Sequence, residues 1–201
     1  MNQTVLGRRQ FSVGMGAVAL GGFGLARAQG EGRIVLGQSA AFTGPAAQLG
    51  VQFNQGAKLF FDQLNAQGGV GKRMVEIRTL DDGYEPDRCK ANTEKLIKDE
   101  VFGLIGYVGT PTCMAALPLI TEAKIPFFGP FTGAESLREP FSRNVFHVRA
   151  SYYDETAEIV HQTTAIGIKR LGVFHQNDSY GQAGLDDERE PPLMRPPRHH
   201  R

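Results

Sequence analysis

The 201-residue chain contains no tryptophan, only two cysteines and almost no net charge. Two cysteines are too few for a dense disulfide scaffold or a four-thiolate zinc site. A formal charge of +1 leaves no basic excess that could neutralise a nucleic acid backbone or an anionic membrane. The remaining composition, 41% hydrophobic and 21% charged, is typical of a globular protein. We therefore expect a globular protein that does not bind nucleic acid.

Residues 1–28 have the composition of an export signal. They contain no acidic residue, place Arg8 and Arg9 before the uncharged residues 10–26, and end in the small-x-small pattern of residues 26–28. The uncharged stretch holds five glycines and is too weakly apolar for a membrane span, which needs about 20 apolar residues. The arginine pair resembles the twin-arginine signal, and general secretion is the alternative route. We expect cleavage after Ala28 and a periplasmic mature protein.

From residue 33 onward, short apolar runs alternate with longer segments of helical periodicity. Strands are expected at residues 34–38, 75–79, 101–105, 125–128, 145–148 and 171–174, and helices at residues 51–67, 86–98, 113–123, 154–166 and from 181. Each crossover is long enough to return the chain parallel to the preceding strand. The pattern predicts an α/β fold, a doubly wound parallel sheet covered by helices on both faces.

The alternation stops at residue 186. Residues 186–201 hold four of the 11 prolines, with Leu193 and Met194 as the large apolar side chains. Such a composition does not pack as a helix or a central strand. We expect an irregular tail there, and our hypothesis is a truncated or frameshifted product whose tail comes from a non-native reading frame.

The loops that follow the strands carry the candidate binding groups. In an open parallel sheet, ligands bind beyond the carboxyl ends of the strands. These loops supply hydroxyl and aromatic side chains, which bind rather than react: Thr43, Tyr84, Tyr107, Thr110, Thr112, Thr132 and Tyr180. Thr110 and Thr112 directly precede the helix expected at 113–123, where free amides and the helix dipole favour a carboxylate. The alternative is that both threonines only cap that helix.

Catalytic and metal-binding patterns are incomplete. Ser39 lies in a sequence that approaches a nucleophile elbow, but Ala41 replaces its second glycine. Residues 68–73 approach a phosphate loop without its first glycine or its metal-binding hydroxyl. Three histidines lie singly, without ligand spacing: His147, His161 and His175. We expect no enzyme activity, no cofactor and no metal, with a serine hydrolase as the minor alternative.

Five segments together resemble one protein family. They are residues 39–50 (SAAFTGPAAQLG), 65–70 (NAQGGV), 81–86 (DDGYEP), 105–110 (IGYVGT) and 177–181 (NDSYG). In this order they are similar to the leucine/isoleucine/valine-binding protein family, the extracytoplasmic receptors of ABC importers. The resemblance implies a type I periplasmic-binding fold, in which two doubly wound lobes close on a small solute. It implies an ABC permease of the inner membrane as the partner.

The resemblance also implies roles for individual residues. The segment around Thr110 matches the loop that holds the ligand carboxylate, and Thr132 and Ala134 lie in the next ligand-contacting loop. Tyr180 matches the aromatic residue of the second lobe, and Leu49 stands where amino-acid binders often carry an aromatic residue. The family's acidic partner for the ligand ammonium lies later than this chain extends. An amino acid, an amide, or an organic or aromatic acid therefore remains open as the solute.

The resemblance sets the expected domains as well. Residues 29–147 form the N-terminal portion of the first lobe and residues 148–185 the start of an incomplete second lobe, between the signal at 1–28 and the tail at 186–201. Since members of the family run considerably further, we expect impaired binding. A ligand-sensing regulatory module of the same fold is the alternative.

The sequence bears on two possible disulfide bonds. Branched-chain amino-acid binders join the positions matching Tyr84 and Gly109 by a disulfide, so that bond is absent here. Cys89 and Cys113 fall on the first turns of successive expected helices. They could form a disulfide or remain separate buried thiols.

Overall fold

The computed structural model describes residues 32–189. The expected export signal with its cleavage after Ala28, and residues 190–201 of the expected tail, lie outside the described residues. Over residues 32–189 the chain contains no helix with both the length and the apolar character that a membrane crossing requires.

Five parallel strands form a single sheet in the order β2-β1-β3-β4-β5. The strands are β1 (Ile34–Ala40), β2 (Val75–Asp81), β3 (Gly103–Ile105), β4 (Phe127–Phe128) and β5 (Val145–Phe146). Leu36 of β1 pairs with Ile77 of β2 on one side and with Gly103 of β3 on the other. From β1 the chain goes to β2 on one side and then crosses to β3 on the other side. The strand order therefore reverses its direction between β1 and β3, and ligands bind at such switch points in open parallel sheets.

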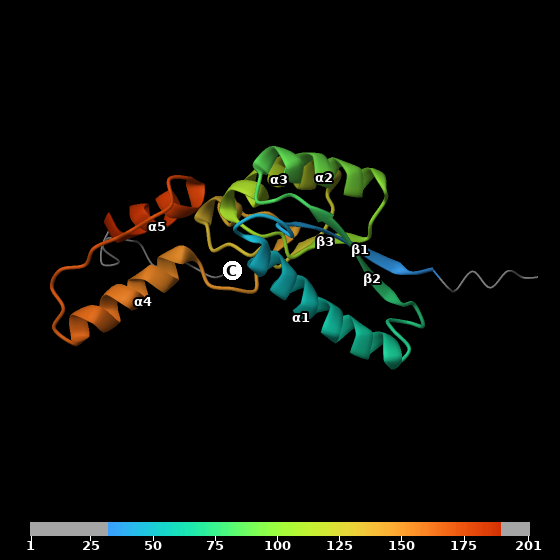
Figure 1. Ribbon diagram of the computed structural model, residues 1–201, viewed down its shortest axis with the longest axis horizontal. Coiled ribbons are helices and arrows are strands. Elements are labelled where there is room, and N and C mark those ends of the chain that lie inside the picture. Colours follow the sequence, from blue (N-terminus) through green and yellow to red (C-terminus); the bar gives the residue numbers. More distant parts are fainter. Residues whose placement is uncertain (1–31, 190–201) are drawn as a thin grey trace, which may run out of the picture.

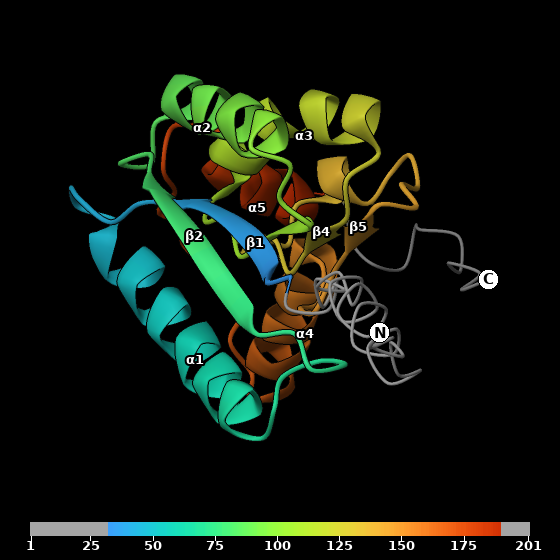
Figure 2. The ribbon, with the colours of Figure 1, turned by 90° about the vertical axis from the view of Figure 1, so that its right-hand side faces the viewer.

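Helices cover both faces of this sheet, so the predicted doubly wound α/β fold is confirmed. α1 (Ala47–Ala66) lies on one face, and α2 (Pro86–Lys98) and α3 (Thr110–Ala123) lie together on the other (Figures 1 and 2). α2 begins at Pro86, where the missing N–H of proline costs nothing because first-turn amides have no helical partner.

The core lies between the sheet and the α2–α3 layer. Leu96, Leu104, Ile120 and Phe127 are fully buried there. On the α1 side, Asn54 Nδ2 donates to Gln38 Oε1 at 2.8 Å, and Gln38 Nε2 donates to the carbonyl of Gly106 at 3.0 Å. These buried amides are tolerated because each finds a partner.

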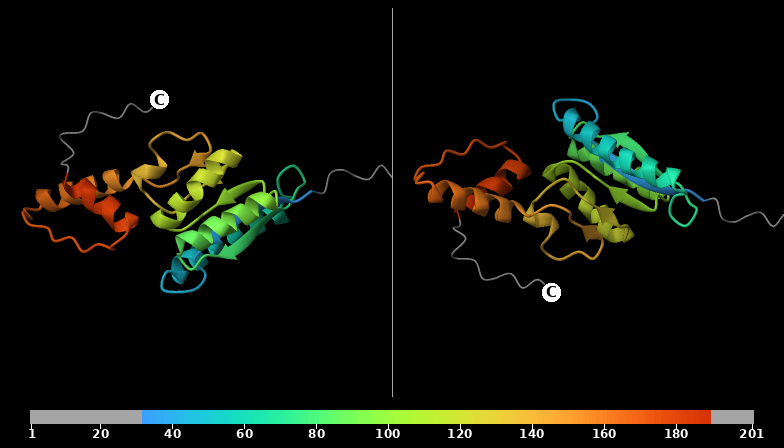
Figure 3. Two further views of the ribbon diagram at one scale, coloured as in Figure 1. Left: turned by 90° about the horizontal axis from the view of Figure 1, so that it is seen from above. Right: turned by 90° about the horizontal axis from the view of Figure 1, so that it is seen from below.

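The remaining elements lie beyond one end of the sheet. They are α4 (Tyr152–Ala165) and α5 (Ser179–Arg189), which follow the short 3₁₀ helix η1 (Glu135–Leu137) and β5 (Figures 1 and 3). α4 and α5 pack against each other rather than against a sheet face.

Two expectations about this region are wrong. The strand expected at residues 171–174 does not form, and Phe174 there is 102% exposed. A strand is stabilised by backbone hydrogen bonds to a neighbouring strand, and no strand of residues 32–189 runs beside this segment. The irregular chain expected from residue 186 instead continues α5 to Arg189. Residues 186–189 contain no proline or glycine, and the bias against helix acts only at the residue before Pro191.

Candidate ligand-binding site

A cleft of about 570 Å³ lies where the loops after the strands meet the α4–α5 region. Its lining comes from the loops after the five strands, from the first turn of α1, and from α4, α5 and the residue Gln176 before α5: Pro45, Ala46, Leu49, Gly83, Tyr84, Glu85, Val108, Gly109, Phe131, Arg149, Tyr152, Gln176 and Tyr180. This is the carboxyl-end edge of the sheet, as the sequence predicts. The volume suits a small organic molecule.

Asp81 ties the first two loops of the cleft together. Its carboxylate accepts hydrogen bonds from Phe42 N at 2.8 Å, Thr43 Oγ1 at 2.6 Å and Gly83 N at 3.0 Å, and it pairs with Arg88 at 3.0 Å. Burial opposes ionisation, but these donors outweigh it and hold the pKa of Asp81 well below its usual range.

Asp82 has the opposite environment and fixes Ser39. Its buried carboxylate accepts from Ser39 Oγ at 2.8 Å and from Tyr84 N at 2.9 Å. Burial raises its pKa above the usual value, more than these bonds lower it. Ser39 is itself fully buried, and its hydroxyl also accepts from Asn92 at 3.1 Å. The candidate nucleophile is therefore a structural hydroxyl with no access to the cleft.

Tyr84 and Gly109 lie in contact on the cleft wall. A Cβ added to Gly109 would lie 2.4 Å from Cε2 of the Tyr84 ring. The two positions that the resemblance pairs are thus neighbours, with an aromatic ring against a bare backbone. Burial raises the pKa of Tyr84 to about 12, so the phenol stays neutral at physiological pH.

Four of the expected ligand-binding residues are buried behind the cleft surface: Thr110, Thr112, Thr132 and Ala134. Thr110 and Thr112 occupy the first turn of α3 rather than the loop before it, because this helix starts three residues earlier than expected, at Thr110. Thr110 Oγ1 lies 2.6 Å from Thr132 Oγ1, and Ala134 N donates to Thr132 Oγ1 at 3.2 Å. Thr112 Oγ1 donates to the carbonyl of Gly109 at 3.0 Å, so it serves the backbone.

Of the seven site residues expected from the sequence, Leu49, Tyr84 and Tyr180 therefore line one cleft. Thr110, Thr132 and Ala134 form one buried cluster, linked toward the cleft because Thr132 Oγ1 donates to Tyr152 Oη at 3.3 Å. Thr112 does not share these hydrogen bonds, because its hydroxyl donates to backbone carbonyls.

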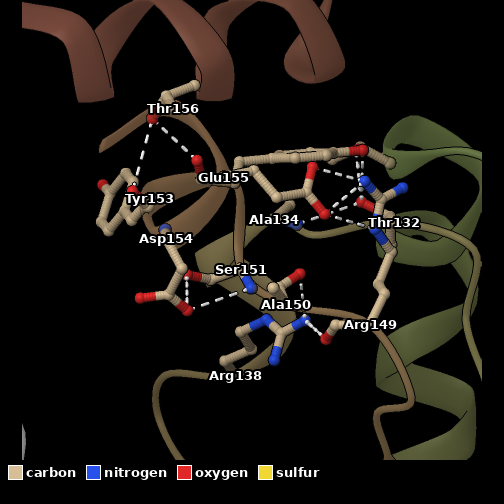
Figure 4. Close-up of polar contacts among 12 residues, drawn as sticks. Thr132, Ala134, Arg138, Arg149, Ala150, Ser151, Tyr153, Asp154, Glu155 and Thr156 are labelled. Carbon is tan, nitrogen blue, oxygen red and sulfur yellow. Dashed lines mark hydrogen bonds and ion pairs between the residues drawn. The ribbon is translucent and has the colours of Figure 1, made fainter. Parts of the chain in front are cut away.

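Sequence reasoning missed the surroundings of Arg149, whose guanidinium pairs with Glu155 (Figure 4) and lies over two aromatic rings. The guanidinium carbon lies 5.5 Å from the Phe131 ring centroid and 5.2 Å from that of Tyr152. Tyr152 in turn meets Tyr180 edge-on at 5.6 Å. Arg149 directly follows the extended segment expected at 145–148, so a cation at the expected lobe boundary was the available signal.

Glu155 holds Arg149 from one side. Its Oε1 accepts from Nε at 3.0 Å and from Nη2 at 2.6 Å, and Oε2 accepts from Nη2 at 2.5 Å. Burial disfavours the charge of Arg149, but Glu155 outweighs this and raises the pKa of the guanidinium above its usual value. The guanidinium of Arg149 therefore stays charged in the cleft wall, with Glu155 as its counterion.

Other reactive groups in the described residues are inert or dispersed. Cys89 and Cys113 are free and buried, so the structure has the separate thiols and not the disulfide. Burial raises the pKa of Cys89 to about 12, which keeps this thiol protonated. Among the described side chains, those of residues 32–185, there is no group of three or more His, Cys, Asp or Glu that could bind a metal ion.

Comparison with known proteins gives the family. The family model described as periplasmic binding protein matches residues 33–190. The chain belongs to this family. The resemblance to the leucine/isoleucine/valine-binding proteins and the type I periplasmic-binding fold are thereby confirmed.

Individual members of the family are similar over the same region. A solved structure of a possible leucine/isoleucine/valine-binding protein from Rhodopirellula baltica SH 1 is 41% identical, with a TM-score of 0.75, over 79% of this chain and 43% of that chain. An amino acid binding protein of Pseudomonas aeruginosa is 26% identical over 77% of this chain and 41% of its own length. The Leu/Ile/Val-binding protein BraC3 of Rhizobium johnstonii is 26% identical over 77% and 42%. The chain thus spans less than half the length of these relatives.

Proposed function

We propose that this chain is a solute-binding receptor of an ABC importer, which acts in the periplasm and takes an amino acid or another small carboxylate or amide. The observation that carries the proposal is the cleft at the carboxyl ends of the strands, which is lined by aromatic and backbone groups in a chain of the periplasmic binding protein family. Several relatives are named as amino-acid-binding proteins.

The proposed ligand contacts divide by chemistry. Leu49, Tyr84 and Tyr180 provide apolar and aromatic contact, since they line the cleft. Thr110, Thr132 and Ala134 are the proposed polar cluster for a carboxylate or an amide, with Thr112 supporting the backbone beside them. Binding would shift the receptor between open and closed states, and the permease would read that shift.

Catalysis has no support in the site. Ser39, the candidate nucleophile, has both its hydrogen-bonding roles occupied by Asp82 and Asn92. Among the described residues, those that line the cleft include neither histidine nor cysteine. We therefore propose binding without turnover.

Calorimetry or NMR titration of the purified chain against amino acids, amides and aromatic acids tests the proposal. We expect saturable binding of at least one solute. Tyr180→Ala should weaken it about tenfold, because it removes an aromatic contact to the ligand, and tyrosine is enriched among the contacts whose truncation costs more than about 1 kcal/mol. Phe141→Ala, at an exposed position outside the cleft, is the control. Saturation by none of the solutes, or equal weakening by both variants, would contradict the proposed site.

A further inference from the structure

Aromatic rings make up much of the cleft wall. Tyr84, Phe131, Tyr152 and Tyr180 all line it, although they come from four separate parts of the chain. Beyond this wall the ring series continues, since Phe53 meets Phe131 edge-on at 6.1 Å. Aromatic pairs at such spacings favour a further flat ring in offset or edge-on contact. The wall is therefore shaped for a planar apolar group.

Arg149 is the basic residue named in the cleft lining. Arg149 lines the cleft, and Glu155 engages its Nε and Nη2 edges. Among the side chains of residues 32–185, the structure gives no hydrogen bond to Nη1 of Arg149, which leaves that nitrogen able to donate to a ligand. The acidic member of the lining is Glu85, which is exposed to solvent.

This arrangement disfavours a cationic ligand. A ring cage can bind an ammonium group through its π faces, but in this cleft the faces of Phe131 and Tyr152 already carry the guanidinium. A second cation beside Arg149 would be repelled. An anion instead finds a planar, always charged donor that suits a carboxylate.

We propose that the ligand is an aromatic carboxylate, whose carboxylate binds Arg149 and whose ring lies against Tyr84, Tyr152 and Tyr180. The inference rests on the proposed solute-binding function. It assigns Arg149 as the residue that determines specificity, and it makes Glu155 a competitor, because Glu155 and the ligand both offer a carboxylate to the same guanidinium.

NMR titration of the full chain with benzoate, benzyl alcohol and leucine tests this. Benzyl alcohol keeps the ring without the charge, and leucine keeps a carboxylate without the aromatic ring. We expect benzoate to bind at least about tenfold more tightly than benzyl alcohol, since a hydrogen bond to a charged group has about that effect. Benzoate should also bind more tightly than leucine, which lacks the ring contact and carries an ammonium group that Arg149 would repel. Arg149→Gln should reduce benzoate affinity to that of benzyl alcohol. Arg143→Gln, an identical charge change at an exposed position outside the cleft, should leave both affinities unchanged.

The Glu155→Gln variant distinguishes a ligand-binding role of Arg149 from a purely structural role. If Glu155 competes with the ligand, its removal should tighten benzoate severalfold and leave benzyl alcohol unchanged. If Arg149 only supports the fold, Glu155→Gln should leave benzoate unchanged or weaken both probes together, which overturns the inference. Arg149→Lys serves if the glutamine variant fails to fold, and it should also weaken benzoate, because lysine lacks the planar fork.

The outcomes distinguish the aromatic carboxylate ligand from the more general function as a solute receptor. If leucine binds more tightly than benzoate and Arg149→Gln leaves that preference intact, the aromatic carboxylate is wrong while the solute receptor stands. If none of these probes and no solute of the wider panel binds, both are wrong.

Discussion

Gly109 tests how closely the cleft wall is built. Its φ is 104° and its ψ is 148°, a backbone region that is essentially restricted to glycine, and an added Cβ would lie 2.4 Å from Tyr84. We expect Gly109→Ala to lower the free energy of unfolding by at least about 1 to 3 kcal/mol, measured by urea denaturation. The loss should be smaller in a Tyr84→Ala background, where only the backbone strain remains.

Gly56→Ala is the matched control for this change. Gly56 lies inside α1, and an added Cβ there meets nothing within 4 Å. Alanine should therefore stabilise the helix by up to about 1 kcal/mol. A Gly109→Ala protein as stable as the original would show that the Tyr84 contact is not tight.

Asp81 and Asp82 should respond to pH in opposite directions. The lowered pKa of Asp81 adds stability that is present above the unfolded value, near pH 4, and is lost as the pH falls toward the folded value. The raised pKa of Asp82 costs stability at neutral pH, and this cost disappears in acid.

Urea unfolding at pH 7 and pH 3 measures both effects. Asp81→Asn should lose about 2 kcal/mol at pH 7 and less at pH 3, because the lost hydrogen bonds are to a charged group. Relative to the original protein, Asp82→Asn should be more favourable at pH 7 than at pH 3. The same pH trend in both variants would contradict the opposite environments of the two carboxylates.

At the scale of elements, α4 depends on its first turn. Ser151 Oγ accepts from Asp154 N at 3.0 Å, and the Asp154 side chain accepts from Ser151 N at 3.3 Å, which completes a capping box. Ser151→Ala should cost about 1 kcal/mol and speed amide hydrogen exchange in α4. Thr163→Ala, late in the same helix, is the control and should not speed that exchange. Equal exchange rates in both variants would argue against the cap.

The elements also show what a sequence can predict. β1, β2 and α2 were expected because an apolar strand or an amphipathic helix is encoded locally and the sheet then supplies the partners. Residues 171–174 carry the same local pattern, but the part of the chain that the structure describes places no strand beside them, so the pattern alone was misleading. Tyr84 and Tyr180 were expected as binding groups from their loops and Leu49 from the family resemblance, and all three line the cleft. The contacts of Arg149 with Phe131 and Tyr152 were not predicted, because they arise only from tertiary packing.

At the scale of the whole molecule, location is the first question. We infer export from the arginine pair and the small-x-small pattern within residues 1–28. Arg8→Lys with Arg9→Lys should block export of the full chain if the twin-arginine route is used, as measured by fractionation and the size of the mature protein. Unchanged export would point to general secretion. Retention of the unaltered chain in the cytoplasm would contradict the proposed periplasmic role.

Self-association of the chain is the second property of the whole molecule, and it depends on the exposed surface. Large apolar side chains are exposed around α4 and the segment before α5, with Ile159 56%, Ile166 75% and Phe174 102% exposed. Surfaces of this kind promote association. We expect sedimentation velocity to show concentration-dependent oligomers, which Ile166→Asp with Phe174→Asp should reduce. Phe141→Asp, 78% exposed between η1 and β5, should have no such effect. If the original chain stays monomeric at every concentration, or if Phe141→Asp reduces association equally, the α4 region is not the associating surface.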